Sequence, residues 1–300
     1  MYKFTNFAIV ASFFGLWVSS YISNWFQIII GFILIFSFGI LHGSNDLLLI
    51  QNINANTKKV SFVKVLVYYV VVVLFGAICF YLISWLALLL FILISGYHFG
   101  EQQVQSLEII KNKYFEVCFK FSYGIFVLFL LFNFHKTEVQ NITFNIINYT
   151  ISVDYISFFI KFFGVVLLIF YLYLYIYVEK NRNQLLLEIF YLLVFAIIFM
   201  SSSLIWGFAI YFIFWHSIPS MIDQINFLYG KVSLKNGVSY FKSAFLYWIA
   251  SLLGIGILYF VFKGIKIFDA LFFSFLAAIT FPHAFVIVKI FELKKTQKNL

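Results

Sequence analysis

The side chains best suited to metal or acid–base chemistry in this sequence are five histidines, four of them in strongly apolar surroundings. A neutral imidazole binds Fe, Zn, Cu or Ni through a ring nitrogen. Ionisable groups inside a membrane are costly to bury and therefore mark functional candidates, although a single histidine can also serve only as a hydrogen-bonding group between helices. The five are His42, His98, His135, His216 and His283.

The composition is that of a membrane protein. Of the 300 residues, 64% are hydrophobic and 10% are charged, and the mean hydropathy is +1.02. A soluble domain is about half apolar and a quarter charged. We therefore expect an all-α polytopic transmembrane helix bundle. It should form a single integral membrane domain over residues 1–300, with a Lys-rich cytoplasmic tail at 293–300. The two cysteines, Cys79 and Cys118, predict no disulfide framework.

Charge-free runs locate the helices, because a helix needs about 20 residues to cross the hydrocarbon core. The runs predict about ten transmembrane helices, with a range of eight to ten. The polar and aromatic segment 135–156 is either a loop or an interfacial helix. The predicted spans are 6–22, 25–48, 65–84, 86–104, 117–134, 157–178, 185–201, 204–221, 243–262 and 269–290.

The basic residues set the orientation. With both termini in the cytoplasm, 16 of the 20 Lys and Arg residues fall on the cytoplasmic side of the ten spans. This bias is the positive-inside pattern, and it predicts a multi-pass protein of the cell (inner) membrane. It also explains the net charge of +9 without a nucleic-acid partner.

Four of the histidines are predicted to share one depth in the membrane. His42, His98 and His216 lie near the cytoplasmic ends of the second, fourth and eighth spans, and His283 lies in the cytoplasmic half of the tenth. Each is about six to eight residues from its helix end, which is roughly 9–12 Å at the rise of an α-helix. Four imidazoles in one layer predict a metal site. His135 lies at the opposite end of the fifth span and is expected to be an interfacial residue.

Polar residues near these histidines are candidates to orient the imidazoles. Metal-bound histidines usually donate their second ring N–H to a carboxylate or a carbonyl. Asp46 follows His42 by four residues, one helical turn along the same face. Glu101 and Asp223 are also candidates, with a solvated helix end as the alternative for both. The full candidate set is Asp46, Glu101, Asp223 and Gln224.

Four segments of the chain resemble the motifs of the Brp/Blh family, which comprises bacterial and archaeal membrane β-carotene 15,15'-dioxygenases. Together they span residues 42 to 283, and HFGE and WHS-P are fairly specific in combination. The segments are LHGSNDLLL at 41–49, GYHFGEQQ at 96–103, FWHSIPSMIDQ at 214–224 and TFPHAFVI at 280–287.

The resemblance implies a non-haem Fe(II) oxygenase that cleaves the central double bond of β-carotene with O2, giving two molecules of all-trans-retinal. By motif match, the Fe(II) ligands would be His42, His98, His216 and His283. A retinal-binding rhodopsin would be a downstream partner, and the lipid bilayer would supply the substrate. Aromatic residues beside the motif histidines would line a substrate tunnel, or else only pack against helices and lipid. They are Tyr97, Phe99, Phe214, Trp215 and Phe281.

The chain departs from the family pattern in two places. Leu41, Ser44 and Asn45 stand where the first motif more often has Pro and then Ala or Leu, so these positions bear on carotenoid preference. An HxxxH pattern continuing from His216 would need a histidine at position 220, where the chain has Ser220.

Other functions remain open at this point. A metal-ion or proton transporter with a four-histidine site would need polar residues in both halves of the membrane, whereas this chain concentrates them on the predicted cytoplasmic side. A two-metal desaturase usually has about eight histidines in characteristic boxes, and this chain has five. A protein that holds two haems on paired histidines is a further alternative.

Overall fold

The structure is a computed structural model that describes residues 2–54, 61–105, 107, 112–261 and 265–298. These residues fold into helices without a strand, which confirms the predicted all-α class. Helices satisfy their own backbone hydrogen bonds, as an apolar environment requires. The α-helices are α1 (Tyr2–Ser19), α2 (Asn24–Leu34), α3 (Asp46–Asn54), α4 (Phe62–Leu82), α5 (Ser84–Gln103), α6 (Lys113–Phe134), α7 (Lys136–Ile147), α8 (Val153–Tyr177), α9 (Arg182–Met200), α10 (Leu204–Tyr211), α11 (Ile218–Tyr229), α12 (Leu234–Val261) and α13 (Ile265–Lys298). Three short helices are η1 (Ile35–Gly39), η2 (Glu179–Asn181) and η3 (Phe212–Ser217).

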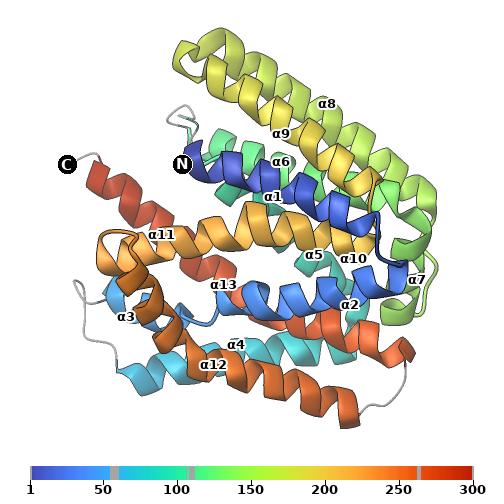
Figure 1. Cartoon of the computed structure of the whole chain (residues 1–300), viewed down its shortest axis with the longest axis vertical. Helices are drawn as coiled ribbons and strands as arrows, with labels where there is room; N and C mark the ends of the chain where they lie inside the picture. The colour runs from blue at the N-terminus through green and yellow to red at the C-terminus, as the bar shows by residue number, and fades with distance from the viewer. Residues whose placement is uncertain (1, 55–60, 106, 108–111, 262–264, 299–300) are drawn as a thin grey trace. The chain divides into compact units, whose positions relative to one another are not determined.

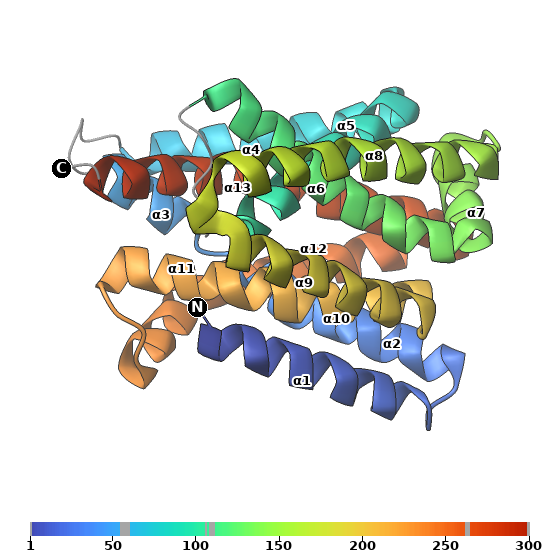
Figure 2. The ribbon, with the colours of Figure 1, turned by 90° about the horizontal axis from the view of Figure 1, so that it is seen from above.

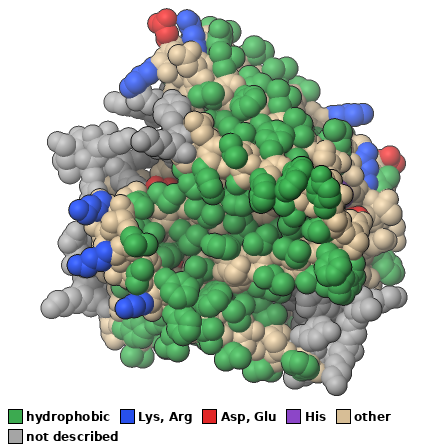
Figure 3. All heavy atoms as spheres, in the orientation of Figure 1, with side chains coloured by type: hydrophobic (Ala, Val, Ile, Leu, Met, Phe, Trp, Pro, Cys, Tyr) green, Lys and Arg blue, Asp and Glu red, His purple; other side chains and the backbone are tan. Residues whose placement is uncertain are grey.

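The outward faces of the long helices are apolar. Within the described residues, seven helices are long and apolar enough to cross a membrane. Large hydrophobic side chains stay exposed along them, such as Phe75 on α4 at 65% and Ile169 on α8 at 61%. Figure 3 shows hydrophobic side chains over most of the face in view. Exposed apolar area on this scale is rare in soluble proteins, and it identifies a polytopic membrane protein.

The predicted spans coincide with helices, but one span is broken. Span 25–48 was expected to be one helix, and this is wrong. The π-helix η1 follows α2, the backbone turns at residues 42–45, and α3 begins at Asp46. His42 therefore lies in a turn between helices.

Helices are also found in segment 135–156, which the sequence left undecided, and in the predicted C-terminal tail. Segment 135–156 contains α7, which resolves the choice between a loop and a helix. At the C-terminal end, α13 continues to Lys298, so most of the predicted tail 293–300 has helical backbone. Residues 299–300 lie outside the described residues.

The helices form two compact units, and the first comprises residues 1–35, 95–144 and 149–219. In this unit α6, α8 and α9 pack together, and they lie side by side in Figures 1 and 2. Helix α10 packs against α2 and α9. The buried rings of Phe195, Tyr211 and Trp215 meet edge to face at 4.8–5.0 Å around Phe195 and form an aromatic centre.

The second unit comprises residues 36–94, 145–148 and 220–300. Helix α13 packs against α3, α4 and α12. Leu49 of α3 is fully buried and joins a hydrophobic cluster with four residues of α13: Val286, Ile287, Ile290 and Phe291. This packing fixes the start of α3 beside the part of α13 that carries His283.

Two glycines of α5 allow the backbone of α6 to approach closely. A Cβ added at Gly100 would overlap the Lys120 carbonyl oxygen, and one added at Gly96 would overlap the Ile125 side chain. Gly124 on α6 presents the matching gap, since its added Cβ would overlap the Gly96 carbonyl oxygen. Small residues are typical of such contacts between membrane helices. Gly96 and Gly100 therefore serve helix packing on either side of His98.

We expect the substitution Gly100→Ala to destabilise the fold by about 1–3 kcal/mol or more, because the obstructing atoms belong to the backbone and can move only with α6. Thermal unfolding in detergent measures the loss. Gly237→Ala is the matched control, since an added Cβ there meets nothing within 4 Å. Equal melting temperatures for the two variants would contradict the close α5–α6 contact.

Candidate metal centre

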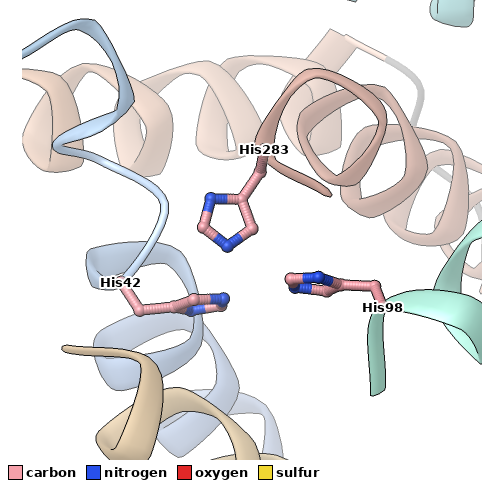
Figure 4. A group of neighbouring side chains, drawn as sticks. All are labelled: His42, His98 and His283. Carbon is pink, nitrogen blue, oxygen red and sulfur yellow. The ribbon is translucent and has the colours of Figure 1, made fainter. Parts of the chain in front are cut away.

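The second unit brings His42 and His283 together, although 240 residues separate them in the sequence. Their ring centroids are 4.6 Å apart and the ring planes are perpendicular. Figure 4 shows the two side chains pointing toward each other, one from the turn before α3 and the other from α13. Both side chains are buried, with His42 5% and His283 3% exposed. Two imidazoles in this arrangement are suited to bind a metal ion.

Asp46 contacts His283, and this contact determines which ring nitrogen is available. The Oδ1 atom of Asp46 lies 2.8 Å from the Nδ1 atom of His283, and the carboxylate is 1% exposed. With Nδ1 as the donor to this carboxylate, Nε2 keeps its lone pair. A carboxylate–histidine pair of this kind is the usual partner arrangement behind a metal ligand. The helical spacing suggested a contact with His42, but the turn at 42–45 directs Asp46 to His283 instead.

The turn that carries His42 is held through its backbone. Gln224 of α11 donates from Nε2 to the His42 carbonyl oxygen at 2.8 Å, and the Tyr240 hydroxyl lies 3.3 Å from the same oxygen. Tyr240 also donates to Gln224 Oε1 at 2.7 Å. Gln224 and Tyr240 are both buried, at 1% and 2% exposed. The turn is therefore fixed from two other helices, α11 and α12.

Ser44 and Asn45, where the chain departs from the family pattern, anchor this same turn. Asn45 donates from Nδ2 to the Tyr240 carbonyl oxygen at 2.9 Å and accepts from Ser243 Oγ at 2.8 Å. Ser44 donates from Oγ to the Ile40 carbonyl oxygen at 2.8 Å. The Asn45 contacts hold the turn against α12, and the Ser44 contact joins the turn to the residue four positions before it, which gives both residues a structural role.

The first unit pairs the other two motif histidines. The ring centroids of His98 on α5 and His216 on η3 are 4.6 Å apart at an interplanar angle of 78°. They are 2% and 1% exposed. Phe212 stacks parallel to His216 at 5.4 Å, and Phe99 meets its edge at 4.7 Å. The second pair thus has aromatic walls.

Both pairs are associated with π-helical backbone. His216 lies within η3, and His42 follows three residues after η1. Single-turn π-helices are rare and occur frequently at functional sites, because the extra residue redirects side chains. Hydropathy carries no signal for this feature.

His135 has a separate role. It caps the C-terminal end of α6, and its Nε2 atom lies 2.9 Å from the Phe199 carbonyl oxygen of α9. His135 thus joins α6 to α9, and its place at the membrane interface stays a prediction.

Two of the acidic candidates differ from Asp46. Glu101 is buried at 3% exposed and forms an ion pair with Lys120 at 3.1 Å, while Tyr97 donates to it at 3.3 Å. Its contacts therefore join α5 to α6. Asp223 is half-buried on α11.

The candidate tunnel residues differ in their burial and in their contacts with the motif histidines. Phe99 contacts both histidines of the first unit, with its ring 6.3 Å from that of His98. Trp215 is buried and donates to Ser12 Oγ at 3.0 Å. Phe214 is half-buried and packs against Phe7 at 6.2 Å. Tyr97 and Phe281 are half-buried.

A cavity of about 360 Å³ in the first unit contains a buried carboxylate that the sequence did not mark. Glu188 is 1% exposed and accepts hydrogen bonds from Gln103, Gln184 and Tyr123 at 3.0–3.4 Å. Phe214 and Trp215, the two residues before His216, line the same cavity. Its volume is in the range of small-molecule sites. The sequence gave no sign of this carboxylate, because a single acidic residue near the end of a predicted span forms no recognisable motif.

Apolar helices that bury paired imidazoles, one pair backed by a carboxylate, define a helical membrane protein equipped for metal chemistry. A family model described as Beta-carotene 15,15'-dioxygenase matches residues 33–291, which include all four motif histidines. The chain therefore belongs to the beta-carotene 15,15'-dioxygenase family and is a carotenoid cleavage oxygenase. No curated protein and no solved structure matches it. The resemblance noted in the sequence motifs is thus confirmed.

The turn at His42 makes a prediction about stability. Gln224→Ala removes a buried donor from the His42 carbonyl oxygen, and we expect a loss of about 1–3 kcal/mol because the oxygen stays buried. Asn52→Ala is the control, since the Asn52 side chain donates to the Leu48 carbonyl oxygen within α3 at an exposed position. Thermal unfolding should show a lower melting temperature for the Gln224 variant alone. Similar values for both variants would argue against the anchored turn.

Proposed function

We propose that this protein cleaves the central double bond of β-carotene with O2, giving two molecules of all-trans-retinal, and that Fe(2+) held by His42, His98, His216 and His283 is its cofactor. The observation that carries the proposal is the buried imidazole pair in each compact unit, within a chain of the dioxygenase family. Buried histidines that did not lie in pairs would not support this proposal.

The residues fit an iron ion. Imidazole nitrogen is a ligand type that suits Fe, and all four side chains are buried away from competing water. The Asp46 contact leaves the Nε2 atom of His283 with its lone pair. The four imidazoles would hold Fe(II) without a carboxylate in direct contact. When bound, the iron supplies the activation of O2 for double-bond cleavage.

The protein's own side chains would exclude water and accept the polyene. Phe99 and Phe212 form an apolar wall on His216. Aromatic faces tolerate positive charge that develops on a conjugated chain. Among the other tunnel candidates, Trp215 and Phe214 lie next to His216 in the sequence. A C40 hydrocarbon dissolves in the bilayer, so the substrate would enter from the lipid.

We propose further that the two units act as a single integral membrane domain of the cell (inner) membrane, with cytoplasmic termini. The excess of Lys and Arg in the predicted cytoplasmic segments supports this orientation. Each unit contributes one imidazole pair, so neither unit alone would hold the proposed four-histidine centre.

A metal-ion or proton transporter is the alternative, and the dioxygenase family favours the enzyme. The transporter would also use the four histidines. It would not consume a carotenoid, so the two functions give different results in the next experiment.

Expression in a host that makes β-carotene should bleach the orange colour and produce retinal, detectable by chromatography. We expect His42→Ala, His98→Ala, His216→Ala and His283→Ala each to lower retinal formation by at least about 100-fold, because each removes a proposed ligand. His135→Ala is the matched control and should retain activity. Orange cells that contain folded, iron-loaded protein would refute β-carotene cleavage.

Metal analysis separates one shared centre from two independent pairs. The purified protein should contain one iron per chain, and each of the four His→Ala variants should lose it. His135→Ala should keep it. Two irons per chain, with one retained after His98 and His216 are both replaced, would contradict a single four-histidine centre.

A further inference from the structure

The Asp46 carboxylate in the second unit has two hydrogen-bonding partners, one on each oxygen. Oδ1 faces the Nδ1 atom of His283 at 2.8 Å. Oδ2 accepts a hydrogen bond from the Tyr69 hydroxyl of α4 at 3.0 Å. Among the described residues, no Lys or Arg forms an ion pair with Asp46. Within the described part of the chain, Asp46 is thus contacted by a hydroxyl and an imidazole rather than by a basic side chain.

The two contacts fix the plane of the carboxylate. One hydrogen bond alone would let the group rotate about its Cβ–Cγ bond, because terminal torsions of this type are broad. A second donor on the other oxygen limits this rotation. Tyr69 comes from α4 and His283 from α13, and these two helices pack against each other and against α3, where Asp46 begins the helix. Three packed helices thus meet in one chain of hydrogen bonds.

We propose that Tyr69 is a positioning residue of the metal centre: through Asp46 it orients the His283 imidazole so that Nε2 faces the metal. This inference rests on the proposed function, since it requires His283 to be a ligand. Tyr69 acts through another residue and touches neither the metal nor the substrate. Partners of this kind typically change metal affinity by 10- to 100-fold.

The neighbouring tyrosine provides a matched control within the same helix. Tyr68 is 71% exposed on the outer face of α4, whereas Tyr69 is half-buried and directed at Asp46. Replacing either tyrosine by phenylalanine removes one hydroxyl and keeps the ring. Both substitutions remove the same group, and the Tyr69 substitution also removes a contact with the Asp46 carboxylate.

The experiment uses the purified full chain in detergent, stripped of metal and titrated with Co²⁺, whose visible absorption reports both binding and ligand geometry. We expect Tyr69→Phe to weaken Co²⁺ binding by about 10- to 100-fold and to change the absorption spectrum. Tyr68→Phe should match the unmodified protein. In an Asp46→Asn background, Tyr69→Phe should add no further loss, because the hydroxyl acts only through the carboxylate.

The outcomes separate the two levels of the inference. An unmodified chain that binds neither Co²⁺ nor Fe²⁺ would overturn the proposed function. Metal binding that is equally tight in the unmodified chain and in Tyr69→Phe would overturn only the role of Tyr69. That role would also be overturned if the metal-free Tyr69→Phe protein melts at a lower temperature in proportion to its lost affinity, since that pattern marks a purely structural contact. An undiminished effect in the Asp46→Asn background would overturn it as well.

Discussion

Burying polar groups where no water can reach them is the constraint on which this structure depends. Unpaired polar groups in apolar surroundings cost several kcal/mol, so each must find its partner within the protein. The His42 carbonyl oxygen takes donors from α11 and α12, and Asp46 is bonded from α4 and α13. Such contacts tie together helices that otherwise pack through apolar side chains. The polar groups that support the chemistry therefore also determine how the second unit is assembled.

The fold could be predicted from the sequence wherever charge and polarity mark the ends of helices. Charge-free runs located the helices because lipid-facing segments exclude ionised side chains. The prediction of a single helix over 25–48 was wrong, because the apolar run gives no sign that the backbone changes from an α-helix to a π-helix and then to a turn. Hydropathy measures the polarity of side chains, so it does not reveal the backbone turn at residues 42–45. Segment 135–156 was undecided because it is polar rather than apolar. Its polar residues fit either a loop or a helix, and the structure contains the helix α7 there.

The candidate site was only partly accessible to sequence reasoning. Four histidines in apolar surroundings are conspicuous in the sequence, and only the structure shows that they lie in pairs within each unit. Their polar partners were harder to find. Asp46 was selected from its spacing to His42, yet its contact is with His283, 237 residues away. Tyr69 and Tyr240 could not be distinguished among 20 tyrosines, because only the tertiary arrangement shows which hydroxyl meets a buried acceptor.

The π-helix η3 makes the position of His216 depend on the local winding of the backbone. A π-helix contains one residue more than the α-helix it interrupts. Regular α-helical winding over the same residues would rotate the imidazole by up to about 100° around the helix axis, the angle that one residue occupies. The ring would then leave the face that meets His98. A change of winding alone, with every residue kept, would here move a side chain from one face of the helix to another. The winding of this short segment is therefore as specific a requirement as the identity of the histidine itself.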